Sequence, residues 1–490
     1  MRELVKRGIE LTNYYGQAFC TPARAALMSG MFVHKVGFGG PDILGAIDLE
    51  ISAWANFSLA GGSAVTLLPG YLAQAGYATH GIGKWNLGHC TDTMLPTARG
   101  FDTYFGYFGA GIDYVSHQSE MTATSPNTFE YEGVTYDLYD MVECTPSCTP
   151  ALDVTGIYST TLFSRKAVEK IEAFVGRSYE SYVYVAYHGV HDDNQINATA
   201  ASFDAATLAT LDELVALRRR NFAVGIHACD RGVGEIKAAL DKYSENYVLV
   251  VHSDNGGYNC GTYCDSNNWP YRGIKFYDFE GALKVPGVVY ANQLIDDTRR
   301  GSTYDGLMHH VDWVATFVSG IASKPTALAD CSDCDSLNHW PSILDGASEK
   351  YDVRDTIYHS LDNQFATLRH RNFKLMIGRS NSSWFPPSHE VVDDIRECMD
   401  GGRLNFLFNI DEDPYEQTDL YHVEAYLNHR EYLTDLWRVA YDTGVVQRPA
   451  PAGFAVNSSA AKRAFYLSTT SANKYVVPWN CSLSNDEEYQ

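Results

Sequence analysis

Apolar and polar positions follow two different periods along the first two-thirds of the chain. Apolar residues spaced three to four positions apart predict helices, and dense β-branched or aromatic runs predict strands. We expect helices at 66–75, 162–175 and 206–242, the last with breaks near Gly225 and Gly232, and strands at 77–84, 181–188 and 247–253. Strands separated by helices predict a doubly wound, mainly parallel α/β sheet. The almost wholly apolar run 247–253 is typical of a strand buried on both faces.

The pattern changes after about residue 350. Hairpin-like strands at 356–361, 366–377 and 404–410, with an amphipathic helix near 422–441, predict a smaller antiparallel α+β domain. We therefore divide the chain into a large domain at 1–350, a small domain at 351–470 and a polar tail at 471–490.

The first residues predict a helix rather than a targeting signal. The stretch MRELVKRGIELTNYYG places Leu4, Val5, Ile9 and Leu11 on one side of a helix and lacks the apolar core of a secretion signal. No stretch approaches the ~20 apolar residues that cross a bilayer as a helix. We expect no apolar strand before Cys20, no signal peptide in this chain and no membrane span.

Net charge argues against one class of partner. Lys and Arg number 37 against 60 Asp and Glu, so the formal charge is −23. Such a chain is repelled by the phosphate backbone of nucleic acids. We expect no nucleic-acid partner.

Cysteines and glycosylation triplets favour the secretory pathway. The 11 cysteines include three close pairs in polar loops, 144/148, 260/264 and 331/334, which suit short disulfides. Cys331-x-x-Cys334 also resembles half of a zinc site but lacks a second pair at the required spacing. N-x-S/T triplets begin at Asn56, Asn197, Asn381, Asn457 and Asn480. We expect a secreted or lysosome-like protein whose targeting segment lies upstream of this sequence.

The sharpest local motif is CTPAR at 20–24. Pro22 suits the first turn of a helix and the following AALM continues it, so Cys20 is expected at a helix N-terminus. By itself the motif fits a buried cysteine equally well. A histidine follows the strand at 181–188, and four further segments accompany the motif, GKWNLG at 83–88, LPTARGFDTYFGY at 95–107, SDNGG at 253–257 and NNWPYRGIKFYDFEG at 267–281.

In this order and spacing the segments resemble the type I, formylglycine-dependent sulfatases. Residues 76–281 are most similar to the arylsulfatase B (N-acetylgalactosamine-4-sulfatase) branch, and LFNIDEDPYEQTDL at 407–420 extends the resemblance into the small domain. The resemblance implies an alkaline-phosphatase-like fold and a hydrolase for aryl or carbohydrate sulfate esters. It also implies a formylglycine-generating enzyme as a partner during maturation.

The resemblance assigns the nucleophile and its cations. Cys20 would be oxidised to formylglycine, whose hydrate attacks sulfur with one oxygen and expels sulfate with the other, whereas a simple hydroxyl would stay trapped as an ester. Arg24 would hold the diol. Lys84 and Lys275 would contact sulfate, because the negative charge of the transition state requires fixed cations.

Proton transfer and metal binding are assigned in the same way. His191, in YHGVHDD, would bind sulfate and help to protonate the leaving group. His188 is the rival, although its place at the end of a strand is typical of a packed histidine. Asp254 and Asn255, together with the modified Cys20, would bind one Ca²⁺ through hard oxygen ligands.

This chain departs from the family pattern in two places. Family members open with an apolar strand that ends in two metal-binding aspartates, and this chain starts after that point, so we expect an N-terminally incomplete sulfatase. The family motif GKWHLG is GKWNLG here. Asn86 cannot take a proton as the usual histidine does, which predicts slow breakdown of the sulfated intermediate. His89, three residues on, is a possible substitute.

Two other functions compete with hydrolysis of sulfate esters. A non-catalytic homologue would bind sulfated glycans without turnover. A phosphatase of the alkaline phosphatase superfamily would use Ser or Thr with two zinc ions, and Cys20 argues against it. The chemical state of Cys20 and the hydrolysis of an aryl sulfate separate these functions.

Overall fold

The structure is a computed structural model of the 490-residue chain. It describes residues 1–36, 65–89, 92–119, 128–131, 134–137, 139–191, 207, 209, 217–244, 246–258, 266–346, 349–386 and 400–444. The predicted tail at 471–490, the Cys260/Cys264 pair and the glycosylation triplets at Asn56, Asn197, Asn457 and Asn480 lie outside the described residues.

One sheet of the large domain has five strands in the order β8-β7-β4-β3-β9. Its strands are β3 (Ala78–Lys84), β4 (Thr103–Tyr107), β7 (Val142–Cys144), β8 (Cys148–Pro150) and β9 (Ser181–Ala186). β3 pairs in parallel with β4 and β9, and β7 and β8 add an antiparallel edge. Helices α5 (Ser159–Ala173) and α7 (Leu217–Tyr243) pack together beside this sheet and share a core with Ile82. The parallel strands place their carboxyl ends at one edge, where a site is expected.

A second sheet has four strands in the order β10-β11-β1-β12. Its strands are β1 (Ile9–Leu11), β10 (Val248–His252), β11 (Gly287–Ala291) and β12 (Ser302–Tyr304). β11 pairs antiparallel with β10 and β1, and β1 pairs in parallel with β12. Next to it, β2 (Tyr14–Tyr15) and β13 (Met308–His309) form a parallel pair. The predicted fold class is therefore correct, with the parallel strands divided between two sheets.

The N-terminus differs from the prediction of one amphipathic helix. Helix α1 (Arg2–Arg7) ends at Gly8, and Ile9–Leu11 is a strand with Ile9 and Leu11 buried in the core. A Cβ on Gly8 would lie 2.4 Å from the carbonyl oxygen of Val289, so a glycine is needed where the chain enters the sheet. The expectation of no apolar strand before Cys20 was therefore wrong, because pairing with β11 and β12 decides the conformation.

The predicted breaks near Gly225 and Gly232 are also wrong. Helix α7 runs without interruption from Leu217 to Tyr243. A Cβ on Gly232 would lie 2.1 Å from the hydroxyl of Ser164 on α5. This glycine permits close packing of two helices instead of ending one of them.

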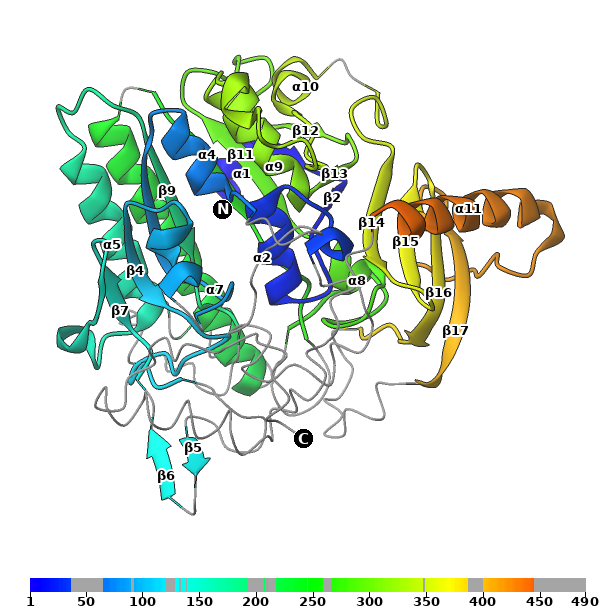
Figure 1. Cartoon of the computed structure of the whole chain (residues 1–490), viewed down its shortest axis with the longest axis horizontal. Coiled ribbons are helices and arrows are strands. Elements are labelled where there is room, and N and C mark those ends of the chain that lie inside the picture. The colour runs from blue at the N-terminus through cyan, green and yellow to red at the C-terminus, as the bar shows by residue number, and fades with distance from the viewer. Residues whose placement is uncertain are drawn as a thin grey trace, which may run out of the picture.

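The small domain is an antiparallel sheet covered by a helix, as the sequence predicts. Its strands are β14 (Thr356–Leu361), β15 (Ala366–His370), β16 (Phe373–Asn381) and β17 (Asp400–Asn409), paired in that order. Helix α11 (Leu427–Gly444) packs against β15 and β16, with Leu433 buried between them. In Figure 1 this sheet and α11 lie at the right, and α5 and β7 lie at the opposite side of the molecule. The boundaries at 350 and 470 stay predictions.

The remaining described α-helices and strands, apart from short 3-10 and π-helical segments, belong to the large domain. They are α2 (Cys20–Ser29), α4 (Leu68–Gln74), α8 (Glu280–Leu283), α9 (Trp313–Ala315), α10 (Trp340–Asp345) and the hairpin of β5 (Thr128–Tyr131) and β6 (Val134–Asp137). Cys144–Cys148 and Cys331–Cys334 form the two predicted disulfide loops that fall within these residues, which removes the zinc interpretation of Cys331-x-x-Cys334. None of the described helices is long and apolar enough to cross a membrane.

Candidate active site

Cys20 occupies the first position of α2, as its motif predicts. Phe19 precedes it in an extended conformation, and Pro22 lies in the first turn. The side chain is buried, is not part of a disulfide, and lines a large cavity. The sulfur therefore lies at a partly open cavity in which a small anionic group can meet it.

Arg24, one turn further along α2, joins three distant segments. Its guanidinium donates to the carbonyl oxygen of Lys84 at 3.0 Å, to the hydroxyl of Tyr184 on β9 at 3.3 Å, and to the carboxylate of Asp254 at 3.2 Å. Because Lys84 and Tyr184 belong to the first sheet and Asp254 follows β10 of the second, Arg24 connects the carboxyl ends of both sheets. Sequence reasoning missed Tyr184, which stood only as one residue of a β run.

Basic side chains surround the sulfur of Cys20. Burial by itself would raise the pKa of the Cys20 thiol, but Lys275, Lys84 and Arg24 outweigh burial and lower it. Burial lowers the pKa of Lys84, and the neighbouring Cys20 and Asp254 partly offset that effect. Three cations at one sulfur make the electrostatic environment that a sulfate group requires, despite the overall charge of −23.

The two candidate histidines lie in different surroundings. His191 is half-buried, and its Nε2 accepts from the ammonium of Lys275 at 3.3 Å. Burial, followed by Lys275 and Lys84, holds the pKa of His191 well below its usual range. His188 is almost fully buried, bonds the hydroxyl of Tyr107 at 3.3 Å through Nδ1 and packs with its ring centroid 4.2 Å from that of Tyr114. This is the packed environment expected for His188, and the role of His191 stays a prediction.

Asp254 and Asn255 follow β10 at the same edge of the fold. Burial would raise the pKa of Asp254, but Arg24, Lys84 and Lys275 lower it to about 2. One oxygen of Asp254 accepts from the backbone N–H of Asn255 at 3.0 Å, while the buried Oδ1 of Asn255 has no hydrogen-bond partner. An orphaned amide oxygen beside a carboxylate suits a hard cation. No group of three or more His, Cys, Asp or Glu that could hold a metal occurs in the described part of the chain.

Asn86 contacts the nucleophile helix directly. Its Oδ1 accepts from the hydroxyl of Thr21 at 3.1 Å, and its backbone has a positive φ of 55°. The side chain is fully buried. His89 is buried with its ring stacked on Phe108, and burial lowers the pKa of His89 to about 3. Neither Asn86 nor His89 lines the cavity, and Asn86 is the one that contacts α2 through Thr21, so the role of His89 as a substitute stays a prediction.

The cavity extends well beyond these residues. It has a volume of about 1550 Å³ and continues from Cys20 along the whole of β9 and β10, with α5 and α7 among its walls. All five residues of β10 are partly exposed, as are five of the six in β9. The prediction that 247–253 is buried on both faces is therefore wrong, because this edge of β10 borders the cavity.

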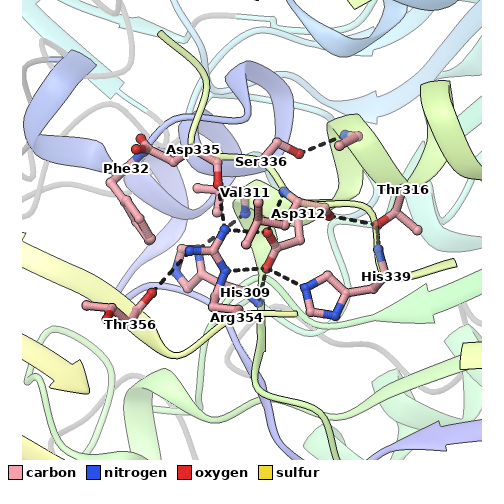
Figure 2. A network of polar contacts seen from close by, with 12 residues as sticks. Phe32, His309, Val311, Asp312, Thr316, Asp335, Ser336, His339, Arg354 and Thr356 are labelled. Atoms are coloured by element: carbon pink, nitrogen blue, oxygen red, sulfur yellow. Dashed lines mark hydrogen bonds and ion pairs between the residues drawn. The ribbon is translucent and has the colours of Figure 1, made fainter. Parts of the chain in front are cut away.

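A buried polar network lies next to α2, on the segment 309–312 that packs against this helix. Arg354 donates to both oxygens of Asp312, which also accepts from the backbone N–H of His309, as Figure 2 shows. The adjacent His310 contacts the carbonyl oxygens of Ala23 at 3.3 Å and Ser253 at 3.2 Å. This histidine links the nucleophile helix to the segment before Asp254. Sequence reasoning missed it, although the run MHHVDW at 308–313 was a usable signal.

Comparison with known proteins agrees with this geometry. The Sulfatase family model matches residues 1–320, and the chain therefore belongs to the sulfatase family of enzymes. It is 28% identical to mouse arylsulfatase J over 447 residues, which are 85% of this chain and 68% of that protein. It is 23% identical to mouse N-acetylgalactosamine-6-sulfatase over 430 residues, 84% of this chain and 75% of that protein. The crystal structure of the PsFucS1 sulfatase from Pseudoalteromonas sp. matches its fold with a TM-score of 0.65 and 20% identity, covering 91% of this chain and 85% of the other.

Proposed function

We propose that this sulfatase hydrolyses aryl or carbohydrate sulfate esters through a formylglycine made from Cys20. One observation carries the proposal, namely the cavity position of Cys20 at the start of α2 with Arg24, Lys84 and Lys275 around it. A buried structural cysteine would not need three cations, because burial alone favours the neutral thiol. The formylglycine hydrate would supply one oxygen to attack sulfur and another to expel sulfate.

Different side chains would bind sulfate and transfer the proton. Lys84 and Lys275 would bind the sulfate oxygens, and Arg24 would hold the hydrated position 20 against the edge of the sheet. His191 is kept neutral by its low pKa, and its Nε2 accepts from the ammonium of Lys275 at 3.3 Å, so it would relay a proton from Lys275 to the departing alcohol. In these roles the positive charges that bind sulfate come from α2, from β3 and from the loop that precedes α8.

A calcium ion is the cofactor that we propose. Asp254 and the orphaned oxygen of Asn255 fit a hard cation, and formylglycine would add a further oxygen. Calcium takes about 6–8 oxygen ligands, so the described residues alone do not complete its coordination. No step above is therefore assigned to the ion. The second candidate function is a homologue that binds sulfated glycans without turnover, for which the three cations around position 20 would suffice.

One experiment separates the enzyme from the binding protein. Mass spectrometry of the peptide containing Cys20 is expected to find an aldehyde after expression with a formylglycine-generating enzyme. The same protein is expected to hydrolyse a chromogenic aryl sulfate, and a calcium chelator is expected to abolish hydrolysis. An unmodified thiol and intact sulfate ester, with retained binding of a sulfated glycan, would establish the binding protein instead.

Replacing Asn86 with histidine is expected to raise turnover. A histidine can take the proton that Asn86 cannot, and a positioned general base contributes at least about tenfold. The backbone can accept the change, because histidine is enriched among residues with positive φ. We expect kcat for an aryl sulfate to increase, with an Asn86→Ala variant as the control that gains nothing. An unchanged or lower kcat in Asn86→His would remove position 86 from the mechanism.

The proposal also covers the cellular compartment of this protein, its maturation and its branch of the sulfatase family. We propose passage through the secretory pathway, where a formylglycine-generating enzyme acts and the disulfides Cys144–Cys148 and Cys331–Cys334 persist. The comparisons support the sulfatase family but not the arylsulfatase B branch in particular, which stays a prediction. The natural substrate would be an aryl sulfate or a sulfated carbohydrate.

A further inference from the structure

The backbone of the segment that carries Lys275 is hydrogen-bonded to the nucleophile loop, the residues just before Cys20. The N–H of Lys275 donates to the carbonyl oxygen of Gly257 at 2.9 Å, and the N–H of Phe276 donates to that of Ala18 at 2.7 Å. Phe276 has a positive φ of 81°, an unfavourable conformation for a bulky residue. Such a conformation persists only where the surroundings impose it.

Arg272, three residues before Lys275, is held by the small domain. Its guanidinium donates to the carbonyl oxygens of Ser382 at 2.9 Å and Glu416 at 3.0 Å, and to the side-chain oxygen of Asn381 at 2.5 Å. Aromatic rings surround the same group, with centroid distances of 4.4 Å to Phe279, 4.4 Å to Trp384, 5.3 Å to Phe406 and 5.8 Å to Phe408. Arg272 is only 7% exposed, so these contacts replace most of the water that would otherwise solvate its guanidinium.

Asp278, three residues after Lys275, is held by the same sheet. Its carboxylate accepts from the hydroxyls of Ser360 on β14 at 2.7 Å and Thr367 on β15 at 2.6 Å, and from Nε of Arg379 on β16 at 2.7 Å. The side chain is buried. Charge-assisted bonds from three strands fix one carboxylate firmly.

We propose that Arg272 and Asp278 are positioning residues for Lys275, through which the small domain sets the affinity of the active site for sulfate. The sheet β14–β17 holds the segment on both sides of Lys275, so the backbone from which its ammonium extends is fixed against Gly257 and Ala18. The inference rests on the proposed role of Lys275 in sulfate binding. It assigns the small domain a part in the reaction although Arg272 and Asp278 themselves do not touch the substrate.

The test combines kinetics with amide hydrogen exchange in the full chain. Arg272→Lys keeps the charge but loses the planar fork, and Asp278→Asn keeps the shape but loses the charge. In both variants we expect amides of 272–281 to exchange at least about tenfold faster, with the distant helix α5 unchanged. We expect KM for an aryl sulfate to rise about tenfold and kcat to fall by a smaller factor, because Lys275 meets both the bound sulfate and the charge of the transition state.

Matched controls and a reference variant separate the possible outcomes. Arg438→Lys and Asp435→Asn alter an exposed pair on α11 and should change neither measurement. If both positioning variants leave exchange in 272–281 unchanged, the inference is overturned, whatever the enzyme does. Faster exchange with an unchanged KM also overturns it, provided that Lys275→Ala raises KM. If Lys275→Ala leaves KM unchanged, the proposed role of Lys275 in sulfate binding is wrong. Amide hydrogen exchange then decides by itself whether the small domain holds residues 272–281 in place.

A milder variant covers the case in which both substitutions prevent folding. Thr367→Val removes one hydrogen bond to Asp278 and keeps the shape of the side chain. It is expected to accelerate exchange in 272–281 by a smaller factor and to raise KM in the same direction. No change in either quantity in the folded Thr367→Val protein would contradict the inference.

Discussion

A Cys20→Ser variant should release one equivalent of alcohol per chain and then stop. A serine hydroxyl in the place of Cys20 meets the same three cations and can attack sulfur, but the resulting ester has no second oxygen with which to expel sulfate. We expect steady-state turnover of an aryl sulfate to fall by at least about 10³-fold. Rapid-mixing kinetics should show the burst, and mass spectrometry should find one sulfo group on the peptide containing position 20.

Cys20→Ala is the matched control for this result. It removes the attacking atom while leaving Arg24, Lys84 and Lys275 in place, so neither a burst nor a sulfated peptide is expected. Continued multiple turnover by Cys20→Ser would mean that a simple hydroxyl suffices, and the two-oxygen role of position 20 would be wrong. Equal residual activity in both variants would place the nucleophile elsewhere.

A Lys374→Met variant should lose about 3–5 kcal/mol of stability. The ammonium of Lys374 is fully buried and bonds Glu280 at 3.1 Å and Glu416 at 2.8 Å, both also buried. Without it, two carboxylates face each other in a dry interior. Urea denaturation should measure the loss. Lys350→Met, which removes a partly exposed pair with Asp411, is the control and should cost less than about 1 kcal/mol.

The same cluster makes stability depend on pH in a defined direction. Burial, opposed by Lys374, raises the pKa of Glu416 to about 7. Burial would also raise the pKa of Glu280, but Lys374, Arg369 and Lys284 together lower it to about 2. The contribution of Glu416 is complete below an unfolded pKa of about 4.3 and is lost as pH rises through 7. The contribution of Glu280 is present above about 4.3 and is lost as pH falls through 2. The cluster therefore stabilises the fold most in mildly acidic solution.

Glu416→Gln should remove the decline of stability between pH 5 and pH 8. Glu416 and Glu280 titrate as a pair, so the window belongs to the cluster rather than to one residue. Denaturation curves at several pH values should be flatter for the variant than for the parent over this range. A parent protein whose stability rises from pH 5 to pH 8 would contradict this assignment.

Local sequence predicted the helix that carries the nucleophile and three strands of the two large sheets. Pro22 and the following AALM were enough to place Cys20 at the start of α2, and apolar runs located β3, β9 and β10 to within two residues. The antiparallel small domain followed from its hairpin pattern. These features depend on residues within about one turn or one strand, which is why a linear reading finds them.

The conformation of several segments depended on partners far along the chain. Ile9–Leu11 is a strand because β11 and β12, nearly 300 residues away, pair with it. Gly232 serves close packing of α7 against α5 and does not end the helix. Strand β10 is partly exposed because a cavity runs along it. Periodicity contains no information about such neighbours.

By itself the sequence determined the chemistry available to this protein, namely a cysteine at a helix start, its family motif and the basic residues that accompany it. Only the tertiary structure decided how those groups are arranged. Arg24 meets Asp254 across 230 residues, and Arg272 and Asp278 are held by a sheet about 80 to 145 residues further on. The reason is physical. Side-chain identity fixes charge and reactivity, whereas distance and burial, which set the strength of these interactions, arise only when remote segments pack together.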